Sequence, residues 1–440
     1  MPVPLGTSFT LASHSAITRE EFFSASTPIL TSTPNLVPAF DQQEEQFSSA
    51  FGIVRDAIAQ RTFPAASIAV TQTGKLIARK SFGKFVYPEN LVGTPSLSRL
   101  RSTEEEPAGG ELSLRELDQE VTPDTLFDLA SITKTVATTT VAMILYERGL
   151  LELEAPVSGI VPEILTGDSR RQAVTLRMLL AHSSGLPAYE KLFLRAKTRE
   201  DLLRAAFTTP LTADPGTRAE YSDIGFIVLG VALERIAGES LDAFCRREIF
   251  GPLGMTHTTF NPPRELRPNI APTADERASS RTEVVANPAK PRSTLRNRVI
   301  QGEVQDENAS VLGGVAGHAG LFSNAEDIAR FAHAMLSGGN PIVRAETIAL
   351  FTRRETTPPG TSRALGWDTP SAPSQSGEYF GARSYGHLGY TGTSLWIDPE
   401  RQLSVTLLTN RTWPDCSNQA IKQVRPKFHD AVLEAVNALG

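Results

Sequence analysis

Hydrophobic and polar positions alternate differently at the ends of the chain and in its middle. From about residue 43, apolar residues recur at three- and four-residue steps, as on one face of a helix. They are Phe47, Phe51, Val54 and Ile58. Two strand-like runs follow at 66–71 and 75–79, and the turn between them contains Gly74. The pattern predicts a helix followed by a β-hairpin.

Helical patterns dominate from Ser131 to about Gly254, with loops at 159–167, 183–187 and 210–223. Strand-like runs return near the end of the chain, at 386–389, 393–397 and 403–408. A closing helix is predicted from about Ala420 to Leu439. Its apolar face comprises Ile421, Val424, Phe428, Val432 and Ala435.

These elements predict an α+β fold, because strand-forming sequence lies at both ends and a helical block lies between them. The simplest arrangement is one antiparallel sheet of N- and C-terminal strands, flanked by helices and placed beside a mainly helical region. The expected divisions are a poorly ordered Ser-, Thr- and Pro-rich arm at 1–43, a sheet domain at 44–127 and 300–440, and a helical domain at 128–299. We expect the active site between the two domains.

Two long irregular segments interrupt this pattern, at 86–123 and 261–310. The first is polar and is expected on the surface. Both are expected to border the active-site cleft and to limit substrate size.

Composition narrows the classes of partner. The 440 residues carry 43 basic and 49 acidic side chains, a net charge of −6, and the basic residues are scattered. This distribution argues against binding to nucleic acid. Cys245 and Cys416 are far apart and lack metal-binding spacing, so both are expected to be reduced and structural.

The chain has no apolar run long enough to span a membrane, and its first 43 residues do not resemble a signal peptide. A soluble protein is predicted, cytoplasmic as numbered. A signal removed before residue 1 would instead give a periplasmic or secreted protein. Oligomeric state cannot be read from the sequence.

Two Ser-x-x-Lys pairs are candidates for nucleophilic chemistry, at Ser131–Lys134 and at Ser81–Lys84. The sequence after Ser131 has no Gly or Pro until Gly149, so Ser131 is expected to open a helix whose free N–H groups and dipole favour negative charge. Lys134 would project from the same face, one turn on.

That helix looks buried, because its body is almost free of charge. Burial favours a neutral lysine, which can act as a base. Ser81 and Lys84 flank Gly83 after a strand and are read as an accidental pair. The alternative for Ser131 is an N-cap serine near a surface lysine, and the short motif alone does not decide between the two.

Several longer segments, in order, resemble the serine β-lactamase and penicillin-binding protein family, in its class C-like branch. This branch includes D-alanyl-D-alanine carboxypeptidases and carboxylesterases. The segments are Phe127-Asp-Leu-Ala-Ser-Ile-Thr-Lys134, Gly149 to Val157, Leu179-Leu-Ala-His-Ser-Ser-Gly-Leu-Pro187, Tyr221-Ser-Asp-Ile-Gly225, Gly320 to Phe331, and Gly386-His-Leu-Gly-Tyr-Thr-Gly-Thr393. In the fifth segment, Ser323 and Glu326 also form a candidate capping box. The resemblance spans about 45 to 440.

The resemblance implies a role for each matching residue. Ser131 would be the nucleophile, Lys134 would help to deprotonate it, and Tyr221 would relay protons to and from the leaving group. The backbone N–H groups of Ser131 and Tyr390 would form the oxyanion hole. The strand that lines the cleft would contain His387 and Gly389. The implied path is acylation of Ser131 and deacylation by water, without metal or organic cofactor.

The chain departs from the family pattern at two positions. The third motif is His387-Leu388-Gly389, where Lys-Thr-Gly or His-Thr-Gly is common, so a hydroxyl that could bond a substrate carboxylate is absent. This argues against efficient hydrolysis of β-lactams. The second motif ends in Asp223, where Asn is frequent. A carboxylate near Lys134 favours the charged lysine and would shift proton handling toward Tyr221.

Other residues have both a structural and a functional interpretation. His182 is expected to form structural hydrogen bonds, and Tyr221 to act in catalysis rather than only in the core. His318 lies in a glycine-rich loop that suits either a ligand or a tight turn. Asp306 and Asn308 are candidates for the cleft wall, although ordinary loop capping explains them better.

No metal site is expected, because His318, His387 and Asp306 lack the spacing of metal ligands. A Gly-x-Ser-x-Gly elbow is also absent, which argues against an α/β-hydrolase.

The sequence therefore predicts a serine hydrolase, with an ester or a D-amino-acid peptide expected over a β-lactam. The alternatives are a penicillin-binding or sensing protein that is acylated without efficient turnover, and an acyltransferase.

Overall fold

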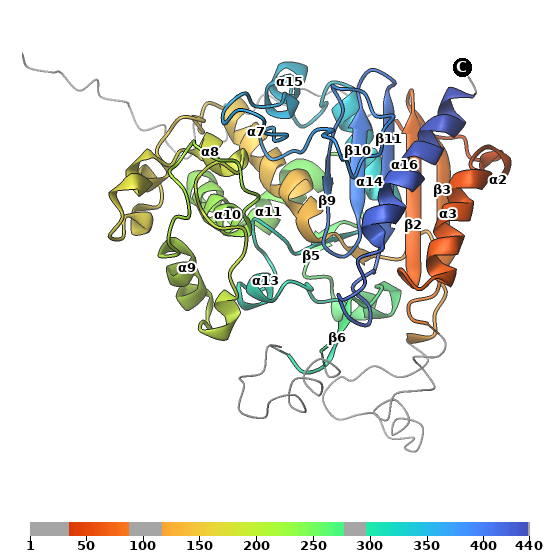
Figure 1. The fold of residues 1–440 in the computed structure, drawn as a ribbon, viewed down its shortest axis with the longest axis horizontal. Coiled ribbons are helices and arrows are strands. Elements are labelled where there is room, and N and C mark those ends of the chain that lie inside the picture. The colour runs from red at the N-terminus through yellow and green to blue at the C-terminus, as the bar shows by residue number, and fades with distance from the viewer. Residues whose placement is uncertain (1–34, 88–116, 277–295, 439–440) are drawn as a thin grey trace, which may run out of the picture. The chain divides into compact units, whose positions relative to one another are not determined.

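The computed structural model describes residues 35–87, 117–276 and 296–438 (Figure 1). These residues belong to one compact unit that extends from Thr33 to Gly440. The predicted arm lies outside the described residues up to position 34. Its end belongs to the fold, because Leu36 is buried and Val37–Pro38 forms strand β1.

One six-stranded sheet forms the main β-structure, as predicted from the two ends of the chain. Its strands are β1, β2 (Ala65–Gln72), β3 (Lys75–Gly83), β9 (Tyr385–Leu388), β10 (Ser394–Asp398) and β11 (Leu403–Thr409). Their order is β1-β3-β2-β11-β10-β9, and every pair except β1 with β3 is antiparallel. The central pairing of β2 with β11 joins residues more than 300 positions apart. The sheet therefore forms only when distant segments of the chain come together.

The turn between β2 and β3 is a two-residue loop in which both residues have positive φ. Thr73 has φ 45° and Gly74 has φ 79°. Positive φ at both positions matches the right-handed twist of a hairpin, and glycine adopts it without strain. The predicted hairpin is therefore confirmed.

Side chains on the sheet alternate between two hydrophobic cores, as the two-residue period of a strand requires. In β2, Ala66, Ile68 and Val70 pack on one side, and Ala65 and Ala69 on the other. Helices α3 (Ser48–Ala59) and α16 (Ile421–Asn437) pack against each other over the first side. Helix α14 (Ala325–Leu336) covers the second side (Figure 1).

The middle of the chain is mainly helical, as predicted. It contains α7 (Thr140–Glu147), α8 (Leu176–Leu180), α9 (Arg199–Phe207), α10 (Asp223–Ala237) and α11 (Leu241–Cys245). Further α-helices in the described residues are α2 (Gln43–Gln46), α13 (Glu307–Val311) and α15 (Ala345–Thr352). Small sheets pair β4 (Phe127–Asp128) and β5 (Thr259–Phe260) with β8 (Leu321–Ser323), and β6 (Ala274–Asp275) with β7 (Val299–Ile300). Of the irregular segments, 88–116 and 277–295 lie outside the described residues.

The predicted capping box at the start of α14 is wrong. The N-cap is Asn324, whose side-chain oxygen accepts a hydrogen bond from the N–H of Asp327 at 2.9 Å. Ser323 belongs to β8, and its hydroxyl lies 2.7 Å from that of Thr258. Ser323 and Asn324 are both good capping residues. Because Ser323 is part of strand β8, Asn324 becomes the N-cap.

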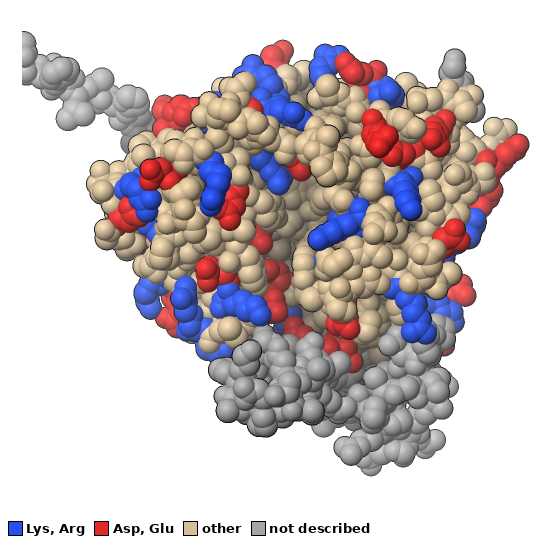
Figure 2. All heavy atoms as spheres, viewed as in Figure 1, with Lys and Arg blue, Asp and Glu red and all other residues tan. Residues whose placement is uncertain are grey.

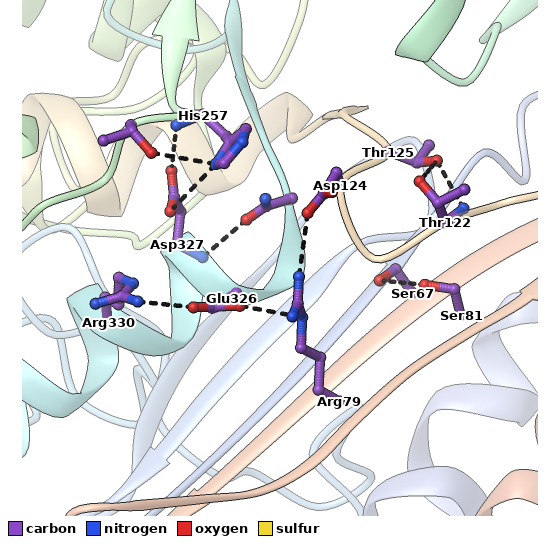
Figure 3. Close-up of polar contacts among 12 residues, drawn as sticks. Ser67, Arg79, Ser81, Thr122, Asp124, Thr125, His257, Glu326, Asp327 and Arg330 are labelled. Atoms are coloured by element: carbon purple, nitrogen blue, oxygen red, sulfur yellow. Dashed lines mark hydrogen bonds and ion pairs between the residues drawn. The ribbon is translucent and has the colours of Figure 1, made fainter. Parts of the chain in front are cut away.

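Glu326 instead joins three parts of the fold (Figure 3). It pairs with Arg330 in its own helix at 2.7 Å, and with Arg79 of β3 at 3.0 Å. Arg79 also contacts Asp124, in the loop before β4, at 3.1 Å.

The second Ser-x-x-Lys pair is accidental, as predicted. Ser81 Oγ lies 3.3 Å from Ser67 Oγ on the neighbouring strand (Figure 3). Lys84 Nζ instead contacts Asp118 at 2.9 Å. The two residues of the pair are thus engaged with different partners.

Candidate active site

The three remote motif segments line one cleft. Its volume is about 710 Å³, and its walls contain Ser131, Tyr221 and His387. Figure 2, in the same view as Figure 1, shows a hollow near the middle of the molecular surface, with acidic side chains in its wall and basic side chains at its rim. Ionisable groups of both signs line the cleft: Asp223, Asp306, Glu307, Asp368, Lys191, Arg363, Arg411, Lys422 and Arg425.

Ser131 lies in a 3-10 turn, Ala130–Ile132, and not at the first turn of an α-helix. Ser131 therefore opens a helical segment, as predicted, but the first turn of that segment is 3-10 rather than α-helical. The alternative of an N-cap serine near a surface lysine is wrong, because Lys134 is buried. Ala130 has φ 47°, a left-handed conformation that is unusual for a residue other than glycine, and its N–H donates to Asp128 Oδ1 at 2.8 Å. This backbone directs Ser131 into the cleft. Strained positions of this kind are common at functional sites.

Lys134 opens a π-helical stretch, Lys134–Thr139, which continues into α7. Its side chain is 0% exposed. Its Nζ atom has three partners: Ser131 Oγ at 2.8 Å, the carbonyl oxygen of His318 at 2.9 Å and Asp223 Oδ1 at 2.7 Å. The predicted contact between Ser131 and a buried Lys134 is confirmed. The predicted carboxylate is also present beside the amine.

Tyr221 approaches the same serine oxygen from the other side. Its hydroxyl donates to Ser131 Oγ at 2.5 Å. The residue directly precedes α10, and Ser222 caps that helix by accepting from the N–H of Gly225 at 2.9 Å. The N–H of Ser222 donates to Nδ1 of His182 at 3.0 Å, so His182 helps to place Tyr221, as its predicted structural role requires.

Burial is the largest influence on the pKa of both Lys134 and Tyr221. It lowers the pKa of Lys134 from its usual 10.5, and the opposing charge of Asp223 is the smaller influence. Burial, followed by Asp223, raises the pKa of Tyr221 well above 10. Both shifts favour a neutral amine and a protonated phenol. Asp223 was expected to shift proton handling toward Tyr221, but here it helps to keep Tyr221 protonated.

Strand β9 forms the opposite wall of the cleft and contributes His387. The turn after it is tied to the segment before Ser131. Thr391 Oγ1 donates to the carbonyl oxygen of Asp128 at 2.7 Å, and Thr393 Oγ1 donates to that of Leu129 at 3.0 Å. The cleft wall also includes Gly389 and Tyr390. The predicted oxyanion-hole residues therefore lie in one cleft.

Gly389 is required by this close approach. A Cβ atom there would lie 2.5 Å from the carbonyl oxygen of Leu129 and 1.9 Å from Thr393 Oγ1. His387 is buried, and burial lowers its pKa well below 6.5. A neutral ring replaces the cationic lysine that is common at this position of the family motif.

The glycine-rich loop that contains His318 contacts both Lys134 and the cleft wall. The backbone carbonyl oxygen of His318 accepts a hydrogen bond from Lys134, and the Nε2 atom of the His318 ring lies 2.8 Å from Asp306 Oδ1. Asp306 also caps α13 by accepting from the N–H of Ala309, and it lines the cleft. Asn308 is buried, and it bonds Phe193 N and Glu190 O rather than lining the cleft.

Sequence reasoning missed several residues of the cleft wall. Arg363 lies with its guanidinium carbon 5.4 Å from the centre of the Tyr221 ring. Arg411 lies 4.4 Å from the ring of Tyr390 and donates to its carbonyl oxygen at 2.7 Å. Tyr189 is 37% exposed, and it lines the cleft with the free thiol Cys416. None of these four belongs to a recognisable motif.

Across the described parts of the chain, no cluster of three or more His, Cys, Asp or Glu side chains is arranged to hold a metal ion. No helix within these residues is long and apolar enough to cross a membrane.

Comparisons with known proteins agree on one family. The family model described as Beta-lactamase matches residues 50–424. The N-acetylmuramyl-L-alanine amidase of Bacillus subtilis (strain 168) is 31% identical over 372 residues, which cover 79% of this chain and 77% of the relative. A protein of Escherichia coli (strain K12), provisionally named a D-alanyl-D-alanine carboxypeptidase, is 32% identical over 318 residues, which cover 68% of this chain and 72% of the relative.

A solved structure supports the same fold. EstCE1, described as a hydrolase with promiscuous acyltransferase activity, has a TM-score of 0.65 at 21% identity. The comparison covers 89% of this chain and 99% of EstCE1.

Proposed function

The chain belongs to the beta-lactamase family of serine hydrolases, and we propose that it cleaves an amide bond of a peptide-like substrate through an acyl-enzyme on Ser131. The observation that carries this proposal is the arrangement around one oxygen atom. Ser131 Oγ lies 2.8 Å from a buried amine and 2.5 Å from a phenol, in a cleft of about 710 Å³. A nucleophile, a base and an acid therefore meet at one point.

The hydrogen bonds define the first step. With Lys134 neutral, its two N–H groups serve Asp223 and the carbonyl of His318, and its lone pair accepts the proton of Ser131. As that proton moves, Ser131 Oγ bonds to the substrate carbonyl carbon. The N–H groups of Ser131 and Tyr390 are the proposed donors to the oxyanion.

Tyr221 is the proposed acid for the leaving group. Its pKa is raised, so it holds a proton at neutral pH, and its hydroxyl already touches the serine oxygen. An amine departs only after it has gained a proton, whereas many alkoxides and phenolates depart without one. This favours an amide over an ester. The name of the amidase relative, at 31% identity, supports the same choice.

A β-lactam is the less favoured substrate. Leu388, a residue of the cleft wall, replaces the hydroxyl residue of the common third motif. A substrate carboxylate would have no hydroxyl donor at this position, and a site that lacks such a donor binds the group less well.

A small panel of substrates tests the proposal: p-nitrophenyl esters, a D-alanyl-D-alanine peptide, an N-acylated L-alanyl peptide and nitrocefin. We expect amide turnover that Ser131→Ala abolishes, with an unchanged melting temperature. Ser81→Ala is the matched control, because it removes the serine of the accidental pair, and it should retain full activity. Normal turnover by Ser131→Ala would refute the proposal.

The two alternative functions, a penicillin-binding or sensing protein and an acyltransferase, can be distinguished with the same purified protein. A penicillin-binding or sensing protein would show a persistent mass increase after incubation with labelled penicillin. An acyltransferase would yield a new amide or ester when an amine or alcohol is added.

A further inference from the structure

Arg363 lies beside the proposed acid and base without a role in the steps above. It belongs to the connection between α15 and β9 and lines the cleft with a side chain that is 22% exposed. Its guanidinium carbon is 5.4 Å from the centre of the Tyr221 ring. A guanidinium in proteins is charged at every working pH, so this positive charge is permanent.

A short hairpin holds Arg363 in place. Its backbone pairs with that of Asp368, and Asp368 in turn pairs with Gly386 of β9 through two hydrogen bonds of 2.9 Å. The Arg363 side chain also lies 3.5 Å from the carboxylate of Asp368.

The turn of this hairpin packs against the helix of the base. Gly366, with φ 78°, approaches Thr139 so closely that a Cβ atom would lie 1.8 Å from the Thr139 hydroxyl. The same hairpin thus contacts the strand of His387 and the helical segment of Lys134.

Among the described residues, the carboxylate in direct contact with Lys134 is Asp223, at 2.7 Å. Asp368 also lines the cleft, and it lies 3.5 Å from Arg363. Asp306 adds a weaker negative influence on Lys134, and it is itself paired with His318.

Two histidine rings complete the surroundings of Tyr221. The rings of His182 and His387 lie 4.7 Å and 6.0 Å from the ring of Tyr221. Burial lowers the pKa of both well below 6.5, so both are neutral. While Lys134 is neutral, Arg363 is the only cation among the groups described above as facing this phenol.

We propose that Arg363 is a positioning residue that offsets the charge of Asp223, so that Lys134 serves as the base and Tyr221 as the acid. The inference rests on the proposed function. It also accounts for the carboxylate of Asp223 at a position where the family pattern often has a neutral amide. Asp223 orients the Lys134 amine. The positive charge of Arg363 weakens the effect by which the Asp223 carboxylate stabilises the protonated form of that amine.

Arg363 also affects the step in which Tyr221 loses its proton. Lys134 takes the proton of Ser131 as the Oγ–C bond forms. Tyr221 gives its proton to the leaving nitrogen as the C–N bond breaks, and the resulting phenolate takes the proton back from the Lys134 ammonium. Until it regains that proton, the phenolate is close to two cations, because Lys134 Nζ is 4.9 Å and the Arg363 guanidinium carbon 5.4 Å from the centre of the Tyr221 ring. Both charges lower the cost of forming the phenolate.

The pH profile of kcat/KM for the amide substrate tests the proposal. The acid limb should reflect protonation of Lys134. In Arg363→Gln it should move to higher pH by on the order of one unit, because a charge that disfavours the ammonium is lost. Asp223→Asn should move it to lower pH. In the combined variant the limb should return close to its wild-type position.

Two further variants separate charge from structure. Arg363→Lys keeps the charge and should keep the limb near the wild-type position. Arg383→Gln removes a positive charge from an exposed ion pair with Glu400 and should leave the limb and the activity unchanged.

Two results would overturn the role of Arg363: an equal loss of activity at every pH with the limb in place, or a combined variant whose limb stays where Arg363→Gln put it. Inactivity of Ser131→Ala together with an unshifted limb in Arg363→Gln would refute only this inference. Full activity of Ser131→Ala would refute the proposed function instead.

Discussion

The proton on Lys134 controls the proposed chemistry. This amine is fully buried and has three acceptors within 2.9 Å. A charged ammonium satisfies all three but cannot accept the serine proton. The amine therefore has to be neutral before acylation, and burial promotes this by lowering its pKa from 10.5.

A pH dependence with a definite sign follows from the lowered pKa. Below the pKa of Lys134 the ammonium form dominates, so kcat/KM should fall as pH falls through it and reach a plateau above it. Because the pKa is lowered, the plateau should begin at a lower pH than an ordinary lysine would give. A rate that rises only near pH 10.5 would contradict a buried base.

Lys134→Arg tests the same point by substitution. Arginine keeps the positive charge and the donors but cannot give up a proton. We expect kcat to fall by about 10²- to 10⁴-fold at every pH. Lys84→Arg, in the accidental pair, is the control and should be fully active. Arginine is larger than lysine and the site is closed, so Lys134→Ala provides a second variant, and a melting curve checks that each is folded.

The motif residues could be predicted from sequence, and Arg363 could not. Ser131, Lys134 and Tyr221 lie in segments whose residue order is itself distinctive. Arg363 acts through its position alone, and that position depends on a hairpin attached to β9. The charge balance among Lys134, Tyr221 and Asp223 also required the structure, because burial outweighs the pairwise attraction.

At the scale of elements, the turn after β9 places Tyr390 in the same cleft as Ser131. Gly389→Ala should disrupt this arrangement, because the added Cβ atom would lie 2.5 Å from the carbonyl oxygen of Leu129. We expect a loss of about 1–3 kcal/mol in the free energy of unfolding, as for overpacking. A fall in kcat of about 10²-fold or more should accompany it, as for loss of an oxyanion-hole donor.

Gly52→Ala is the matched control for that measurement. Gly52 lies inside α3, and a Cβ atom there would meet nothing within 4 Å. Alanine in a helix interior should raise stability by about 0.5–1 kcal/mol and leave kcat unchanged. If Gly389→Ala were equally harmless, the proposed close approach of the turn to Leu129 would be wrong.

Regular elements could be predicted from periodicity, whereas their irregular ends could not. The alternation in β2 and the apolar face of α16 follow directly from which side chains reach a core. The 3-10 turn at Ser131 and the π-helical stretch after it depend on contacts from distant segments. Thr133 illustrates this, because its hydroxyl accepts from the N–H of Leu321.

At the scale of the whole molecule, the six-stranded sheet brings the segments that form the site together. Pairing of β2 with β11 joins an early and a late strand of the described chain. The threonines after β9 then hold the C-terminal strands against the residues before Ser131. The order of strands could be anticipated only as a single sheet, since register and neighbours are long-range properties.

The mixed charge of the cleft also emerges only from the assembled molecule. Its lining groups come from segments spread between residues 191 and 425, and no local pattern in the sequence gathers them.

The most direct test of the central claim is covalent labelling of the full chain. After reaction with a fluorophosphonate, mass spectrometry should find one adduct per chain, on the peptide that contains Ser131, and Ser131→Ala should remain unlabelled. Equal labelling of Ser131→Ala, or an adduct on another serine of the wild-type chain, would contradict the assignment of Ser131 as the nucleophile.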